Sequence, residues 1–208
     1  MKRSTIYVCG VIIALGAVIW SLGWLRAGVR PIGPDGNPIN DQVEIWAGGV
    51  FQIGLVALLF IMLATRATGA NRLGRWVLNA EIVALALAIA WTIPFLFDAN
   101  RPHNVILLVL DAFWPLSILG LIAVGVLVIR ARRWPVPVRY LPLAASLIIP
   151  VDIFLMVTGV DEWTQIVLRS AYLAVTYTLL GVAIILQVAP LMGSTTDSRD
   201  TQLEPTSV

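Results

Sequence analysis

Three charged residues lie inside long apolar stretches of this 208-residue chain: Asp111, Asp152 and Arg169. A charge inside a membrane span costs about 2.5 kcal/mol or more, so such residues usually pair with one another or serve a function. Two carboxylates and one guanidinium can form a structural ion-pair layer. They can also bind a proton or a small cation, or serve as the paired carboxylates of a lipid-modifying enzyme.

Six apolar stretches carry these residues and are long enough to cross a bilayer, which takes about 20 residues. Hydrophobic residues make up 59% of the chain and charged residues only 12%. Because lipid offers backbone groups no partner, each span should be a helix. We therefore predict an all-α, polytopic membrane protein, a bundle of six transmembrane helices in a single domain over 1–192. The predicted spans lie near 6–25, 44–65, 76–97, 104–129, 140–158 and 165–190. The polar tail 193–208 is expected to be disordered.

Basic residues are distributed unevenly between the two ends of these spans. One side holds four: Arg26, Arg30, Arg101 and Arg169. The other side holds ten: Lys2, Arg3, Arg66, Arg72, Arg75, Arg130, Arg132, Arg133, Arg139 and Arg199. The side with more basic residues is normally cytoplasmic, so both termini should be cytoplasmic. The bias of composition towards arginine over lysine suits a bacterium, and we expect a multi-pass protein of its plasma (inner) membrane.

The three charged residues should lie at similar depths, roughly 6–11 Å below the outer ends of spans four, five and six. Helices consecutive in sequence tend to be neighbours, so an Asp–Arg–Asp cluster is expected. Trp114 shares a helical face with Asp111, and Tyr172 shares one with Arg169. The candidate site is therefore Asp111, Trp114, Asp152, Arg169 and Tyr172.

Two further polar residues are secondary candidates. Glu81 lies on a stripe of small residues in the third span and is expected to pack there and to reach an arginine near the inner interface. Gln52 lies one turn from Gly48 in the second span. The lone cysteine, Cys9, is expected to be a packing residue.

Proline and glycine residues mark expected irregularities. Pro94, Pro115 and Pro150 interrupt three spans, and each should kink its helix, because proline removes a backbone donor. Pro115 would free the carbonyl of Asp111. The long outer loop, roughly 26–43, is rich in proline and glycine and is expected to be a connector of turns.

Several kinds of chemistry are excluded by residues that the chain lacks. Its single histidine, His103, lies in a short loop, which excludes a bis-histidine haem and a zinc site of histidines and cysteines. The only lysine is Lys2, and the sequence contains neither a P-loop nor a GxGxxG motif. We expect no cofactor, and the net charge of +2 does not indicate nucleic acid.

Three functions follow, in this order. The first is non-enzymatic: a structural or partner-binding bundle with a buried Asp/Arg layer, in contact with lipid and with another membrane protein or a second copy. The second is a carrier or receptor for a small cationic or neutral ligand, open to the outside at Asp111, Asp152 and Arg169. The third is a lipid-modifying enzyme that uses the two aspartates.

Overall fold

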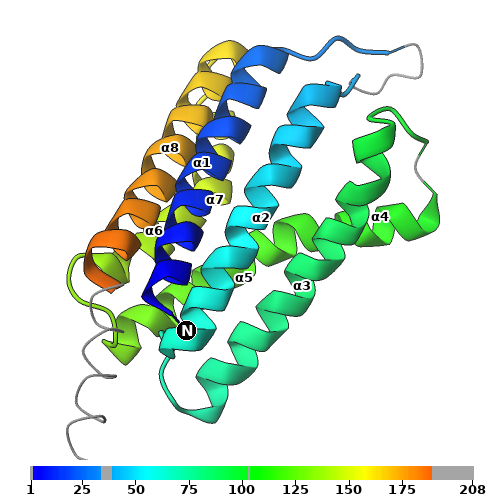
Figure 1. Ribbon diagram of the computed structural model, residues 1–208. Coiled ribbons are helices and arrows are strands. Elements are labelled where there is room, and N and C mark those ends of the chain that lie inside the picture. Colours follow the sequence, from blue (N-terminus) through cyan, green and yellow to red (C-terminus); the bar gives the residue numbers. More distant parts are fainter. Residues whose placement is uncertain (1, 34–38, 103, 189–208) are drawn as a thin grey trace, which may run out of the picture.

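Helices account for all the regular elements of the computed structural model over the residues it describes, 2–33, 39–102 and 104–188 (Figure 1). His103 and the predicted tail 193–208 lie outside these residues. The elements are α1 (Arg3–Ala27), α2 (Gln42–Thr65), α3 (Arg72–Phe97), α4 (Val105–Asp111), α5 (Phe113–Ala131), η1 (Val138–Tyr140), α6 (Leu141–Ser146), α7 (Ile148–Val157), α8 (Glu162–Ala183) and η2 (Ile184–Val188).

The membrane-spanning character predicted from the sequence is supported by the lengths of these helices. Five segments are long and apolar enough to cross a bilayer: α1, α2, α3, the range Val105–Ala131 and the range Glu162–Val188. A sixth results if Val138–Ser146 and Ile148–Val157, which meet at an angle of 44°, form one span. The protein is thus an all-helical bundle with five or six such segments, while the orientation of its termini stays a prediction.

Two of the predicted spans are each divided into two helices near a proline. The break between α4 and α5 falls at Ala112, three residues before Pro115. The break between α6 and α7 falls at Leu147, three residues before Pro150. Proline fits the first turn of a helix, where no backbone donor is needed. Pro115 and Pro150 therefore lie in the first turns of α5 and α7, instead of kinking one continuous helix as predicted. Pro94 instead lies within α3, near its end.

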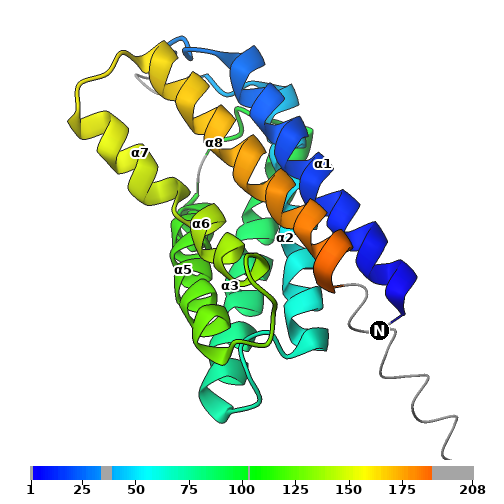
Figure 2. The same ribbon diagram turned by 90° about the vertical axis from the view of Figure 1, so that its left-hand side faces the viewer.

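The main helices form a closed ring of neighbours. Helix α1 packs between α2 and α8, α3 packs against α2 and α5, and α6 connects α5 to α8. Helix α7 contacts α8 and α5 and lies to one side of the bundle (Figure 2). Side chains from most of these elements can therefore reach a common interior.

Helices α1 and α8 approach closely because glycines face each other. A Cβ atom on Gly181 would lie 2.4 Å from the carbonyl oxygen of Gly10, and a Cβ atom on Gly10 would lie 2.8 Å from that of Gly181. Small residues allow such approach where lipid provides no hydrophobic drive for association. The neighbouring Cys9 packs against the core.

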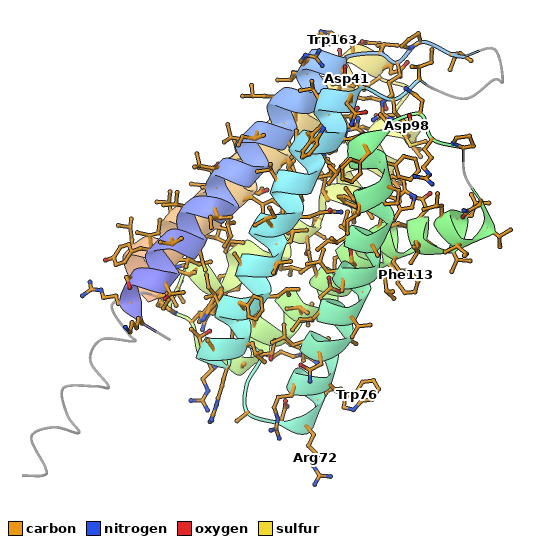
Figure 3. The ribbon with its side chains drawn as sticks, turned by 45° about the vertical axis from the view of Figure 1, so that its right-hand side comes forward. Asp41, Arg72, Trp76, Asp98, Phe113 and Trp163 are labelled. Carbon is orange, nitrogen blue, oxygen red and sulfur yellow. The ribbon has the colours of Figure 1, made fainter. Side chains whose placement is uncertain are left out.

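The two ends of the bundle differ in their connections. One end, which we call the long-loop end, carries the connection between α1 and α2, described at 28–33 and 39–41, and the turns at 98–102 and 158–161. Asp41, Asp98 and Trp163 lie there, and Arg72 lies at the opposite end (Figure 3). The connection is anchored by a bond from the Ile39 N–H to the Pro31 carbonyl at 2.9 Å. Asn40 adds bonds to Ala99 and Asn100 across the end of the bundle.

Candidate functional site

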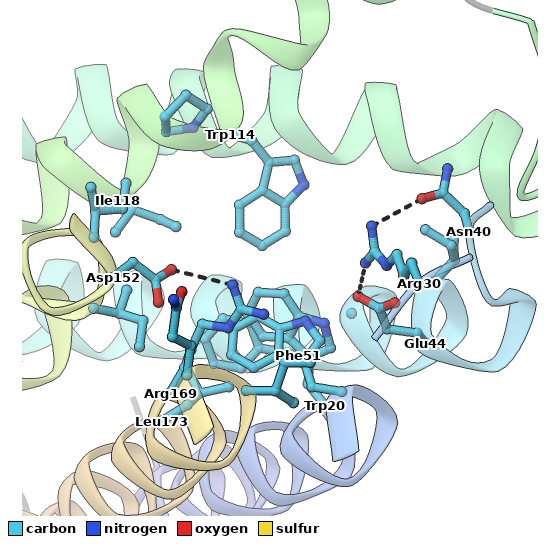
Figure 4. Close-up of a pocket in the computed structure, with 18 of the residues that line it drawn as sticks. Trp20, Arg30, Asn40, Glu44, Phe51, Trp114, Ile118, Asp152, Arg169 and Leu173 are labelled. Carbon is cyan, nitrogen blue, oxygen red and sulfur yellow. Dashed lines mark hydrogen bonds and ion pairs between the residues drawn. The ribbon is translucent and has the colours of Figure 1, made fainter. Parts of the chain in front are cut away.

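A cavity of about 770 Å³ occupies the long-loop half of the bundle (Figure 4). Its lining comes from every α-helix except α6, together with Gly28, Val29, Arg30, Ile32 and Asn40. Several long-range packing contacts, rather than one motif, therefore create the site. The polar lining residues are Arg30, Asn40, Glu44, Thr92, Asp111, Asp152, Glu162, Gln165 and Arg169.

Arg169 of α8 and Asp152 of α7 lie next to each other in the lining of this cavity (Figure 4). The Arg169 Nη1 to Asp152 Oδ2 distance is 3.6 Å, and both side chains are 31% exposed. Charge-assisted hydrogen bonds are shorter, about 2.7–2.9 Å, so this pair is loose and partly solvated. The guanidinium also lies over the ring of Trp24, 4.3 Å from its centroid, and its Nε is buried without a hydrogen-bond partner.

Asp111 and Trp114 reach the same cavity from the two sides of the break at Ala112. Asp111 is the last residue of α4, and Trp114 lies in the first turn of α5. Within the residues that the structure describes, Asp111 has no hydrogen bond or ion pair. Its carboxylate is therefore available to a ligand or to water, and the helix break is what directs both side chains to one cavity.

Aromatic rings form one wall of the cavity. The Trp20 ring centroid lies 4.3 Å from that of Trp24, 4.7 Å from that of Phe51 and 5.2 Å from that of Trp114. Tyr177 meets Phe51 edge to face at 5.0 Å. Apart from Trp114, these rings were not among the predicted site residues, because aromatic residues in the outer half of a span are usually explained by the interfacial belt.

A second ion pair lies between α2 and the segment 28–33. Arg30 is hydrogen-bonded to Glu44, and it donates to Asn40 Oδ1 at 3.1 Å. The Glu44 side chain is 5% exposed, and its Oε2 atom is buried without a partner. The segment predicted to be a plain connector thus borders the cavity. The sequence signal for this ion pair was Glu44 in the first turn of a span, directly after a loop that contains Arg30.

Two acids at the long-loop end cap helices. Burial raises the pKa of Asp41, but the Glu44 N–H and the Arg26 guanidinium outweigh burial and hold this pKa below its ordinary value. Hydrogen bonds from Thr164 lower the pKa of Asp161. The Arg26 Nη1 to Asp41 Oδ1 distance is 2.5 Å. These caps fix the starts of α2 and α8, which carry cavity residues.

Tyr172 and Gln52 lie outside the cavity lining. Tyr172 donates a hydrogen bond to the Ala144 carbonyl and so connects α8 to α6. Gln52 Nε2 donates to Thr92 Oγ1 at 2.8 Å, which connects α2 to α3 in a buried setting. Both residues are therefore helix-packing contacts, although Thr92 also lines the cavity.

Glu81 is likewise outside the lining and is 3% exposed. It forms no ion pair with any residue that the structure describes, in contrast to the expected arginine contact. Its carboxylate lies against Gly120 of α5: a Cβ atom there would be 2.0 Å from Oε2. The Oε1 atom is buried without a partner. Gly120 thus provides the space that the carboxyl group occupies between α3 and α5.

The arrangement supports binding more directly than catalysis or metal coordination. Over the described ranges, no group of three His, Cys, Asp or Glu side chains is placed to hold a metal ion. Comparison of the chain with protein-family models, with curated proteins and with solved structures finds no match. The function must therefore be argued from the cavity itself.

Proposed function

We propose that this chain is a multi-pass membrane protein that binds a small organic solute in the cavity at its long-loop end, as a carrier or receptor. The observation that carries the proposal is the cavity of about 770 Å³ with aromatic walls and converging charged groups. Ligand sites typically measure about 300–1,000 Å³ and combine an apolar lining with a few placed polar groups.

The loose Arg169–Asp152 pair favours this proposal over the structural layer that the sequence placed first. An ion pair that only orders helices should be direct and dry, because removal from water is repaid only by excellent geometry. Here the charged atoms lie 3.6 Å apart and both side chains remain 31% exposed. The distribution of arginines would place the cavity on the outer side of the membrane.

Tryptophan emission provides the test, because four of the eight tryptophans line the cavity. The purified full chain in lipid nanodiscs is titrated with aromatic solutes that differ in charge, and emission and melting temperature are recorded. We expect at least one solute to quench emission saturably and to raise the melting temperature.

A matched pair of variants on α7 controls for non-specific partition into lipid. Ile149 lines the cavity, whereas Ile153 on the same helix is 56% exposed and does not. Ile149→Phe fills cavity space and should weaken binding by about tenfold, in line with overpacking costs of about 1–3 kcal/mol. Ile153→Phe should bind normally. If no solute binds, or if both variants behave alike, the proposal is wrong and the structural bundle is preferred.

A further inference from the structure

The cavity lining carries more acids than bases. Four carboxyl groups, those of Glu44, Asp111, Asp152 and Glu162, face two guanidinium groups, those of Arg30 and Arg169, and the formal charge is −2. The two arginines pair with Glu44 and Asp152. Asp111 and Glu162 have no such partner among the described residues. Glu162 is exposed at the start of α8, whereas Asp111 is partly buried among apolar and aromatic residues, so the Asp111 carboxylate favours a positive ligand more strongly than it would in water.

The aromatic wall has the chemistry to hold the same kind of ligand. A cation over an indole face is attracted by the ring quadrupole, and tryptophan is the best partner for it. The protein already uses this contact, because the Arg169 guanidinium lies 4.3 Å from the Trp24 centroid. Trp114 lies between the two ion pairs and points into the cavity (Figure 4). Its ring is tilted by 41° against that of Trp20.

Anions and bare metal ions fit the cavity less well. Arg30 is hydrogen-bonded to Glu44 and Asn40, and Arg169 lies beside Asp152 and over Trp24, so an anion at either guanidinium group would be repelled by a carboxylate already next to it. Calcium takes six to eight oxygen ligands, whereas the described residues include no three-residue acidic group placed for a metal.

We infer that the ligand is an organic monocation with an apolar or aromatic body. Its charged group would lie beside Asp111 and Trp114, and its body would lie against Trp20 and Phe51. This inference rests on the proposed function, since it names the class of solute that the same cavity binds.

Three probes of similar size and different charge test the inference: phenyltrimethylammonium, its neutral isostere tert-butylbenzene, and benzenesulfonate. Each is titrated into the full chain in nanodiscs of zwitterionic lipid, with tryptophan emission as the readout. A cation–π contact with Trp114 and attraction by the Asp111 carboxylate should make the cation bind about tenfold or more tightly than either other probe. Equal or tighter binding of the neutral probe or the sulfonate overturns the inference and leaves the proposed function standing. Absence of binding by all three overturns both.

Asp111→Asn removes one charge and keeps the shape of the side chain. It should weaken phenyltrimethylammonium about tenfold and leave tert-butylbenzene unchanged. Asp98→Asn is the matched control, because Asp98 lies at the same end but outside the lining, and its Oδ1 accepts a hydrogen bond from the Asn100 N–H. If Asp111→Asn does not fold, Asp111→Ser removes the same charge at the same position of α4. Unchanged cation affinity in the folded variant, or an equal loss in Asp98→Asn, overturns the inference.

Discussion

A double-mutant cycle on Asp152 and Arg169 measures whether their contact is a rigid structural pair or a solvated pair at the edge of a cavity. The variants are Asp152→Asn, Arg169→Gln and the combination of both. The quantity of interest is the coupling free energy, which is the difference between the double variant's loss of stability and the sum of the single losses.

The structure sets the expected size of this coupling. Two unit charges about 4 Å apart attract by roughly 4 kcal/mol at an effective dielectric constant of 20, before solvation and side-chain entropy are subtracted. Both side chains are 31% exposed, and the 3.6 Å separation is too long for a direct hydrogen bond. Exposed pairs typically contribute about 0.2–1 kcal/mol, so we expect a coupling of about 0.5–1 kcal/mol.

The Arg30–Glu44 pair provides an internal reference in the same protein. The Glu44 side chain is only 5% exposed and accepts a direct hydrogen bond from Arg30. Hydrogen bonds to charged groups contribute about 1.5–3 kcal/mol, and we expect a coupling in that range for Arg30→Gln with Glu44→Gln. Both cycles can be measured by equilibrium unfolding in mixed detergent micelles at pH 7, with helical circular dichroism as the probe.

The reasoning is refuted if the Asp152–Arg169 coupling reaches about 3 kcal/mol or equals that of Arg30–Glu44. Loss of one partner from a buried, well-ordered pair costs about 3–5 kcal/mol, so such a result would identify a structural layer. A coupling below about 1 kcal/mol, together with a coupling for the reference pair that is clearly larger, would support the partly solvated cavity.

Three further predictions concern packing and capping. Gly181→Ala should lower stability by about 1–3 kcal/mol, because its Cβ would lie 2.4 Å from the backbone oxygen of Gly10. Gly49→Ala is the control: its Cβ would meet a side-chain carbon at 3.3 Å, and stability should change by less than about 0.5 kcal/mol. Thermal melting compares the two variants. Glu81→Met should raise the free energy of unfolding by about 1–3 kcal/mol, since it removes a buried oxygen without a hydrogen-bond partner. A lower free energy of unfolding, measured by equilibrium unfolding, would instead show that the carboxyl group makes a stabilising contact. The folded-state pKa of Asp161 lies below its ordinary value of 3.8, so its contribution is present above that pH and is lost as pH falls through the lowered pKa. Asp161→Asn should therefore lose less melting temperature than the wild type between pH 7 and pH 3, and equal losses would contradict the capping argument.

Part of the candidate site could be predicted from helix geometry. Asp111, Asp152 and Arg169 were expected at one depth, and all three line one cavity. Whether they bind a ligand stays a prediction. Tyr172 was grouped with Arg169 because they share a helical face, yet its hydroxyl reaches α6 instead. Residues three apart on a helix differ by about 60° in direction, which is enough to face different neighbours.

Sequence alone determined the helical class, the approximate spans and the unequal distribution of arginines. These are local properties, because an apolar run of bilayer length must satisfy its backbone within one helix. Only the tertiary structure decided that Trp20, Phe51 and Glu44 share a cavity with Asp111, and that α4 and α5 divide at Ala112. Those outcomes depend on the rotation of each helix about its axis and on close contacts between helices distant in sequence, such as Gly10 against Gly181. No single segment contains that information.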